Sequence, residues 1–288
     1  MRHQVFLAVS LAGVMAVSAC GERETPEETV ERAFESVNVV NESDLSDVML
    51  TVADPNEAVT YFNRTVRENP KDIEPQRGLA VSLVRAKRYA EGASAFAKVL
   101  DMNGATNADR VDYADALLRA GDWAAAEEQL DTVPPTHETF KRYRLEAMIA
   151  DSNKEWKRAD SFYETAVGLT TRPASVLNNW GYSKLTRGDF ADAERLFGDA
   201  IRQDRTLFTA KNNLILARGA QRNYALPVIP MDQEERAQLL HTLGLAAVKQ
   251  GDIATAKGLF RDAIQTHPQH FEAAVRSLNA LEANVSNG

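Results

Sequence analysis

Apolar and polar positions recur along the chain with a period near 34 residues. The clearest markers are aromatic or apolar residues that follow short polar stretches: Tyr89, Trp123, Trp156, Phe190 and Ile253. The gaps between them are 34, 33, 34 and 63 residues, and Tyr224 divides the last gap into 34 and 29. Around each marker, apolar residues are spaced three and four apart, which places them on one helical face. The pattern therefore predicts repeated helix–turn–helix units.

Other positions of the unit fall in the same register. A small residue comes three positions after each marker, and a large apolar residue four positions later, as in Ala193 with Phe197 and Ala256 with Phe260. Such a unit with a period near 34 is typical of tetratricopeptide repeats. Each unit leaves an apolar face that only its neighbours can cover. The sequence thus predicts an all-α fold, a tetratricopeptide-repeat superhelical solenoid, and the shared register disfavours an unrelated helical bundle.

We expect this domain to span residues 39–288, with about six helix pairs. The pairs start near residues 39, 73, 107, 140, 174 and 237. Residues 208–224 resemble a first helix without its partner, because Pro227 and Pro230 oppose the second helix at a cost of about 3 kcal/mol each. An irregular strap near 225–236 and a capping helix over 269–285 complete the prediction. In the turns, Gly-Asp pairs such as Gly121–Asp122 suit a left-handed C-cap followed by a helix start.

The N-terminal residues have a different character. A positive residue, Arg2, precedes a short apolar run that ends in Val17-Ser18-Ala19-Cys20, and Cys20 is the single cysteine of the chain. The run is too short for a membrane-spanning helix, which needs about 20 apolar residues. Residues 1–19 are therefore predicted to be a signal peptide, and the last four residues resemble the lipobox of bacterial lipoproteins. The alternative is an ordinary secretory signal with a chance cysteine.

The lipobox resemblance implies acylation of Cys20, including a palmitate-type chain. Two or more chains anchor a protein stably to a membrane, whereas one does so marginally. Residues 20–38 would then be a lipidated N-terminus and an acidic tether with six glutamates. Because Gly21 replaces the aspartate that often retains lipoproteins in the inner membrane, we expect a lipid-anchored protein of the outer membrane that faces the periplasm.

Charge and motifs narrow the function. The formal net charge is -8, and no basic block offers the positive surface that nucleic acid requires. We find no phosphate-binding glycine loop, no Gly-x-Ser-x-Gly and no His-Glu-x-x-His. His267 and His270 have a metal-like spacing, but no cysteine or third histidine is near them in sequence. We therefore expect neither an enzyme nor a cofactor-binding protein.

Protein binding is the better hypothesis. The first helices of such a superhelix line a concave groove, and two adjacent units carry the asparagine pairs Asn178–Asn179 and Asn212–Asn213. Since an asparagine amide both donates and accepts hydrogen bonds, it can hold a peptide backbone without reading its sequence. The candidate groove residues are Asn178, Asn179, Tyr182, Asn212 and Asn213, with Lys141 and Arg144 as a positive end. Alternatively, asparagine is merely tolerated on an exposed groove.

The chain as a whole resembles the TadD-type lipoproteins of the tight-adherence (Flp, type IVc) pilus system. Four segments carry the resemblance: Thr51–Ala58, Leu177–Leu185, Tyr224–Met231 and Gln265–Ala274. The resemblance implies a periplasmic adaptor that helps the outer-membrane secretin assemble, in a pilotin-like role, and of the site residues it carries over only Cys20. The alternative is a tetratricopeptide lipoprotein accessory to another envelope machine, for β-barrel insertion or cell-wall synthesis.

Overall fold

The computed structural model describes residues 45–283, and every regular element in this range is helical. A short helix at 45–51 pairs with α2 (Pro55–Glu68), and residues 39–44 of the predicted first unit lie outside the described residues. The following four pairs are α3 (Ile73–Arg85) with α4 (Tyr89–Leu100), α5 (Asn107–Ala120) with α6 (Trp123–Asp131), α7 (Phe140–Ser152) with α8 (Trp156–Gly168), and α9 (Ala174–Thr186) with α10 (Phe190–Gln203).

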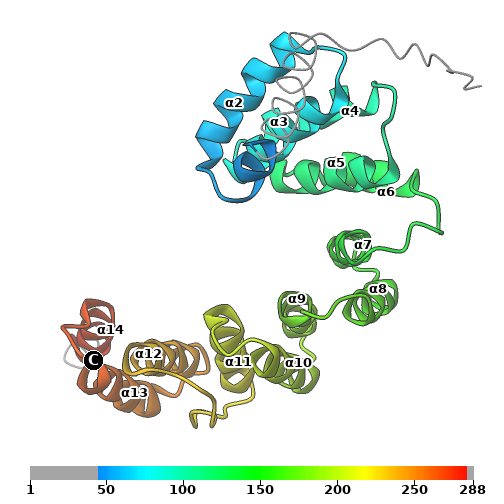
Figure 1. The fold of residues 1–288 in the computed structure, drawn as a ribbon. Coiled ribbons are helices and arrows are strands. Elements are labelled where there is room, and N and C mark those ends of the chain that lie inside the picture. Colours follow the sequence, from blue (N-terminus) through cyan, green and yellow to red (C-terminus); the bar gives the residue numbers. More distant parts are fainter. Residues whose placement is uncertain (1–44, 284–288) are drawn as a thin grey trace, which may run out of the picture.

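The C-terminal part is less regular. It contains the unpaired α11 (Phe208–Ala220), the pair α12 (Gln233–Lys249) and α13 (Ile253–Thr266), and the final helix α14 (Glu272–Ala283). The helices follow an arc, with α7, α9 and α12 on its inner side and α8, α10 and α13 on its outer side (Figure 1). The predicted superhelix of six helix pairs, one half unit and a terminal helix is thus confirmed.

The apolar core extends along this arc. Its buried residues form four clusters, which extend over α2–α7, α7–α9, α9–α11 and α11–α14. Val167 and Trp180 pack against two adjacent clusters, and Ile229 joins the last two. No cluster is closed within one helix pair, so each pair depends on its neighbours for burial.

One backbone conformation recurs at the turn inside the units that follow the first. Gly121, Gly188 and Gly251 have φ of 90°, 85° and 78°, which confirms the predicted left-handed caps. Lys87 and Lys154, at the same repeat position, adopt φ of 61° although they carry a Cβ. The left-handed conformation costs a residue with a side chain roughly 1–2 kcal/mol. Its persistence shows that the turn geometry is imposed by the packing of the two helices.

The helices of a pair approach closely where an aromatic ring covers a glycine. The Phe197 ring on α10 lies over Gly181 on α9, so that a Cβ at Gly181 would come within 2.7 Å of Phe197 Cε1. Phe260 on α13 lies over Gly244 on α12 in the same way, and both rings are fully buried. The small residues Ala193 and Ala256, which precede these two rings by four positions, have no exposed surface.

The segment between α11 and α12 takes the place of a second helix. Residues 221–232 are irregular, and the apolar side chains of Leu226, Ile229 and Met231 pack against the α11–α14 core. The strap ends at 232, earlier than the predicted 236. Asp232 and Glu235 form a capping box that starts α12: Asp232 Oδ1 accepts from Glu235 N at 2.8 Å, and Glu235 Oε2 accepts from Asp232 N at 3.2 Å.

Glu235 also ties α12 to α11. Its carboxylate accepts hydrogen bonds from Lys211 Nζ at 2.7 and 2.9 Å, and the Lys211 side chain is only 3% exposed. Removing one partner of such a buried pair is strongly destabilising, because the other charge stays uncompensated. One carboxylate therefore fixes both the start of α12 and its contact with the unpaired helix.

The terminal helix begins later than predicted. Residues 269–271 are not helical, because His267 Nδ1 accepts from Gln269 N at 3.1 Å in a turn after Pro268, and α14 starts at Glu272. Ala274 is buried, and Leu278 and Leu281 pack against the core as expected for a cap.

Gly244→Ala tests the ring-over-glycine contact. The new methyl group would overlap the buried Phe260 ring, and we expect a loss of about 1–3 kcal/mol in the free energy of unfolding. The measurement is urea denaturation followed by circular dichroism. Gly258→Ala is the matched control: it lies in α13 with nothing within 4 Å of its Cβ position and should gain up to about 1 kcal/mol. Equal effects of the two variants would contradict the packing argument.

Candidate binding groove

A pocket of about 580 Å³ opens where α6, α7, α8, α9 and α11 meet. It mixes aromatic, amide and hydroxyl side chains and a single carboxylate, which is the lining expected of a protein-binding groove. The lining residues are Trp123, Met148, Asp151, Ser152, Trp156, Tyr163, Asn178, Asn179, Tyr182, Ser183, Thr186, Thr209 and Asn213.

Apolar surface in this pocket is accessible to a partner. Tyr182 on α9 is 54% exposed and Trp123, the first residue of α6, is 39% exposed. Trp156, the first residue of α8, and Met148 are partly buried and also line the pocket. Aromatic side chains that remain half exposed in a concavity are typical anchoring points for a partner segment.

The structure brings together three of the four candidate asparagines. Asn178, Asn179 and Asn213 line the pocket. Asn213 Nδ2 donates to Asn178 Oδ1 at 3.0 Å, which joins α11 to α9. The side-chain amide of Asn179 has no hydrogen-bond partner within residues 45–283, so it is available to a ligand. Asn212 is not among the lining residues, because its Oδ1 accepts from Thr242 Oγ1 at 2.9 Å.

Lys141 and Arg144 are not among the lining residues and pair with acidic residues of α5. Lys141 Nζ lies 2.7 Å from Asp112 Oδ1 and 3.2 Å from Asp115 Oδ2. Arg144 Nη2 lies 3.6 Å from Asp115 Oδ1. Neighbouring carboxylates thus compensate both charges, and a contribution of these two residues to partner binding stays a prediction.

Asp151 supplies the negative charge of the pocket. Its Oδ1 accepts from Ser183 Oγ at 2.6 Å and its Oδ2 from Tyr163 Oη at 2.9 Å. Burial raises the pKa of Asp151 above its ordinary value, and the two hydroxyl donors only partly offset this effect. The Tyr163 hydroxyl is itself buried, which raises its pKa and keeps it a neutral donor.

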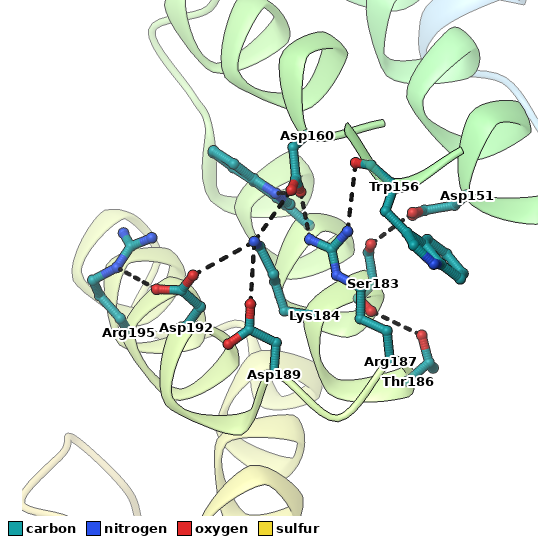
Figure 2. A network of polar contacts seen from close by, with 11 residues as sticks. Asp151, Trp156, Asp160, Ser183, Lys184, Thr186, Arg187, Asp189, Asp192 and Arg195 are labelled. Carbon is teal, nitrogen blue, oxygen red and sulfur yellow. Dashed lines mark hydrogen bonds and ion pairs between the residues drawn. The ribbon is translucent and has the colours of Figure 1, made fainter. Parts of the chain in front are cut away.

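A network around Asp160 holds α8 against α9 beside the pocket (Figure 2). Asp160 Oδ1 accepts from Trp180 Nε1 and from Arg187 Nη2, each at 2.6 Å. Asp160 Oδ2 accepts from Lys184 Nζ at 3.2 Å, and Lys184 also approaches Asp189 Oδ2 at 3.3 Å. Trp180 and Lys184 of α9 and its C-cap residue Arg187 therefore converge on one carboxylate of α8.

Sequence reasoning did not assign Trp123, Trp156, Asp151 or Ser183 to the groove. The sequence pattern marks the two tryptophans only as repeat positions at the start of a second helix. Their residue type could have indicated a binding role, since both are large aromatic residues in adjacent units. Both remain accessible in the structure. Asp151 and Ser183 carried no such signal, because their proximity depends on the stacking of α7 on α9.

The sequence matches two family models, each described as tetratricopeptide repeat, over residues 83–149 and over residues 45–110 and 241–286. Together these segments span more than half of the chain. The chain is a tetratricopeptide-repeat protein. Proteins of this class generally bind protein partners and are typically non-enzymatic. No curated protein matches the sequence.

Solved tetratricopeptide-repeat structures share the fold at low identity. The APC/C hetero-tetramer Cut9–Hcn1 aligns with a TM-score of 0.60 and 13% identity over 82% of this chain, which spans only about half (48%) of the other. A tetratricopeptide repeat protein from Parabacteroides merdae aligns with a TM-score of 0.53 and 13% identity, covering 89% of this chain and 98% of that one. The C-terminal part of a repeat protein from Cytophaga hutchinsonii aligns with a TM-score of 0.54 and 14% identity, covering 82% of this chain and 98% of that one.

Two further findings concern this tetratricopeptide-repeat protein itself. Within residues 45–283, no helix has both the length and the apolar character needed to cross a bilayer. In the same range, no group of three or more His, Cys, Asp or Glu side chains is arranged to hold a metal ion.

Asp160→Asn tests the network that fixes α9. Burial alone would raise the pKa of Asp160, but hydrogen bonds from Trp180, Arg187 and Lys184 outweigh it and lower the pKa below 3.8. The ionised carboxylate therefore stabilises the fold above about pH 4, and this contribution is lost as the pH falls through the folded-state pKa. We expect Asp160→Asn to cost roughly 1–3 kcal/mol at pH 7, toward the lower end because solvent screens a partly exposed group.

Urea denaturation at pH 7 and at pH 3 provides the measurement. The difference between wild type and Asp160→Asn should shrink at pH 3, because the stabilising contribution of the ionised carboxylate declines once the pH lies below the unfolded-state pKa. Asp262→Asn on the exposed face of α13 is the control and should have little effect at either pH. A difference that is the same at both pH values would rule out the ionised carboxylate as its cause.

Proposed function

We propose that this protein is a membrane-anchored periplasmic adaptor that binds an extended partner segment in its groove. Its role is to assist assembly of the tight-adherence (Flp) pilus, in a pilotin-like manner toward the outer-membrane secretin. The observation that carries the binding role is the pocket in which the free amide of Asn179 lies beside the exposed ring of Tyr182.

The chemistry of the pocket supports binding of a peptide backbone. Asn179 offers one acceptor and two donors, so it can bond both the C=O and the N–H groups of an extended chain. Trp123 and Tyr182 supply apolar surface for the side chains of that chain. This division between amide contacts and aromatic contacts suits a partner segment that arrives without secondary structure of its own.

The membrane anchor in this proposal rests on the sequence, because Cys20 lies outside the described residues. Acylation at the lipobox-like segment would confine the protein to one membrane surface. Confinement of both molecules raises the effective concentration of the partner without adding a contact. A groove of modest affinity would then suffice for the function.

The pilus role rests on the resemblance of four segments to TadD-type lipoproteins. Two of them have clear places in the fold: Leu177–Leu185 is the part of α9 that lines the pocket, and Tyr224–Met231 is most of the strap. The alternative is a tetratricopeptide-repeat lipoprotein accessory to β-barrel insertion or cell-wall synthesis, which would use the same groove and anchor.

One experiment tests the anchor and the partner together. Wild type and Cys20→Ala are expressed at equal levels, and membranes are fractionated, solubilised and used for affinity capture with secretin detected by immunoblot. We expect wild type in the outer-membrane fraction with secretin, and Cys20→Ala released from the membrane with little secretin. Capture of barrel-insertion machinery in place of secretin would favour the alternative function.

A second experiment tests the groove. Asn179→Ala removes an amide that has no partner within the described residues, so it should abolish partner capture and leave the thermal midpoint unchanged. Asn213→Ala should act in the same direction but also cost about 1 kcal/mol of stability, because Asn213 bonds Asn178. Asn279→Ala, on the exposed face of α14, is the matched control. Undiminished capture by Asn179→Ala would refute the proposed use of this groove.

A further inference from the structure

The lining of the pocket is electrostatically one-sided. Among its lining residues, Asp151 is the only acidic side chain, and there is no lysine or arginine. The remaining polar groups are amides and hydroxyls, which carry no formal charge. The pocket therefore presents a single negative charge in a setting that is otherwise neutral and partly aromatic.

The Asp151 carboxylate forms no ion pair within the described residues. Its two bonds come from the neutral hydroxyls of Ser183 and Tyr163, one to each oxygen. A carboxylate has about four acceptor sites, so each oxygen retains one. Arg187 is close enough to influence Asp151 electrostatically, but its guanidinium donates to Asp160 Oδ1 at 2.6 Å and to the Trp156 carbonyl at 3.4 Å.

Aromatic side chains surround this charge. Trp156, Trp123 and Tyr182 line the same pocket as Asp151, and Figure 2 shows Trp156, Asp151 and Ser183 in one neighbourhood. Trp156 already receives a cation in the fold, since the Arg187 guanidinium carbon lies 5.6 Å from its ring centroid. Tryptophan and tyrosine rings attract cations through their quadrupole and pack against the apolar stem of lysine or arginine.

We propose that the groove recognises a basic side chain, lysine or arginine, in the extended segment of its protein partner. The cationic head pairs with the Asp151 carboxylate, and the side-chain stem lies against Trp123, Trp156 and Tyr182. This inference rests on the proposed peptide-binding function and adds a specificity to it. The asparagines hold the backbone, whereas Asp151 selects one side chain.

Charge complementarity favours a basic segment of a partner over a segment of this chain as the occupant of the pocket. Residues 21–38 are long enough to act as an extended segment, but they carry six glutamates against two arginines. An acidic segment would be repelled by Asp151, which already carries its charge in a partly buried site. A basic partner segment brings the compensating charge that the pocket lacks.

The test uses the full mature chain in detergent and four synthetic peptides. The probes are ten-residue Ala/Ser peptides that are identical except for a central lysine, arginine, norleucine or glutamate, and binding is measured by fluorescence polarisation. We expect the lysine and arginine peptides to bind roughly tenfold more tightly than the norleucine peptide, as one charge-assisted contact allows, and the glutamate peptide to bind most weakly.

Variants of the lining residues test which side chains cause the preference for basic peptides. Asp151→Asn keeps an acceptor for one hydroxyl and should erase the tenfold preference while norleucine-peptide binding stays unchanged. Trp123→Ala, at a partly exposed position, should weaken binding of all peptides and of the basic ones most. Glu164→Gln, exposed on α8, is the matched charge control and should leave the preference intact. Circular dichroism and the thermal midpoint verify that each variant is folded.

The outcomes separate this inference from the function on which it rests. Equal binding of basic and norleucine peptides, or a preference that survives in Asp151→Asn, would overturn the basic-residue specificity and leave peptide binding in place. If Asp151→Asn unfolds, the salt dependence of peptide binding to the wild type tests the inference instead. Salt screens a charge pair, so binding of the basic peptides should weaken between 50 and 500 mM NaCl, whereas binding of the norleucine peptide should not. Binding of no peptide at all would overturn both.

Discussion

The constraint on which the structure depends is that no helix pair can bury its own apolar face. Within a pair, contact is close because rings such as Phe197 and Phe260 lie over glycines. Between pairs, Val167 and Trp180 pack against both the α7–α9 cluster and the α9–α11 cluster and so join them. The stacked units follow a curve, and the first helices α7, α9 and α12 lie on its inner side (Figure 1).

The groove follows from this curvature. Polar side chains on the inner side face each other across units, and the fold must satisfy those that become buried. Asn213 does so by bonding Asn178, and Asp151 by accepting from Ser183 and Tyr163. The side-chain amide of Asn179 stays free, since no described residue forms a hydrogen bond with it. The same stacking that builds the core thus selects which polar groups remain available to a partner.

The sequence predicted those features that depend on local spacing. The helix pairs, the left-handed turn at Gly121 and the missing second helix after α11 all follow from residues close together in the chain. The strap boundary was missed because the Asp232–Glu235 capping box starts the helix four residues early. The composition of the pocket could not be predicted, because Trp123, Asp151 and Asn213 converge only through the curvature of several stacked units.

The energetics of Asp151 connect the fold to recognition. Burial raises its folded-state pKa above the unfolded value, so at neutral pH its ionised form opposes folding, and the opposition disappears as the pH falls through the raised pKa. A bound cation would reverse this balance, because an opposite charge at close range favours the ionised carboxylate. In the proposed complex, a basic partner residue would offset the desolvation of the Asp151 charge, while Ser183 and Tyr163 keep the carboxylate positioned before the partner arrives.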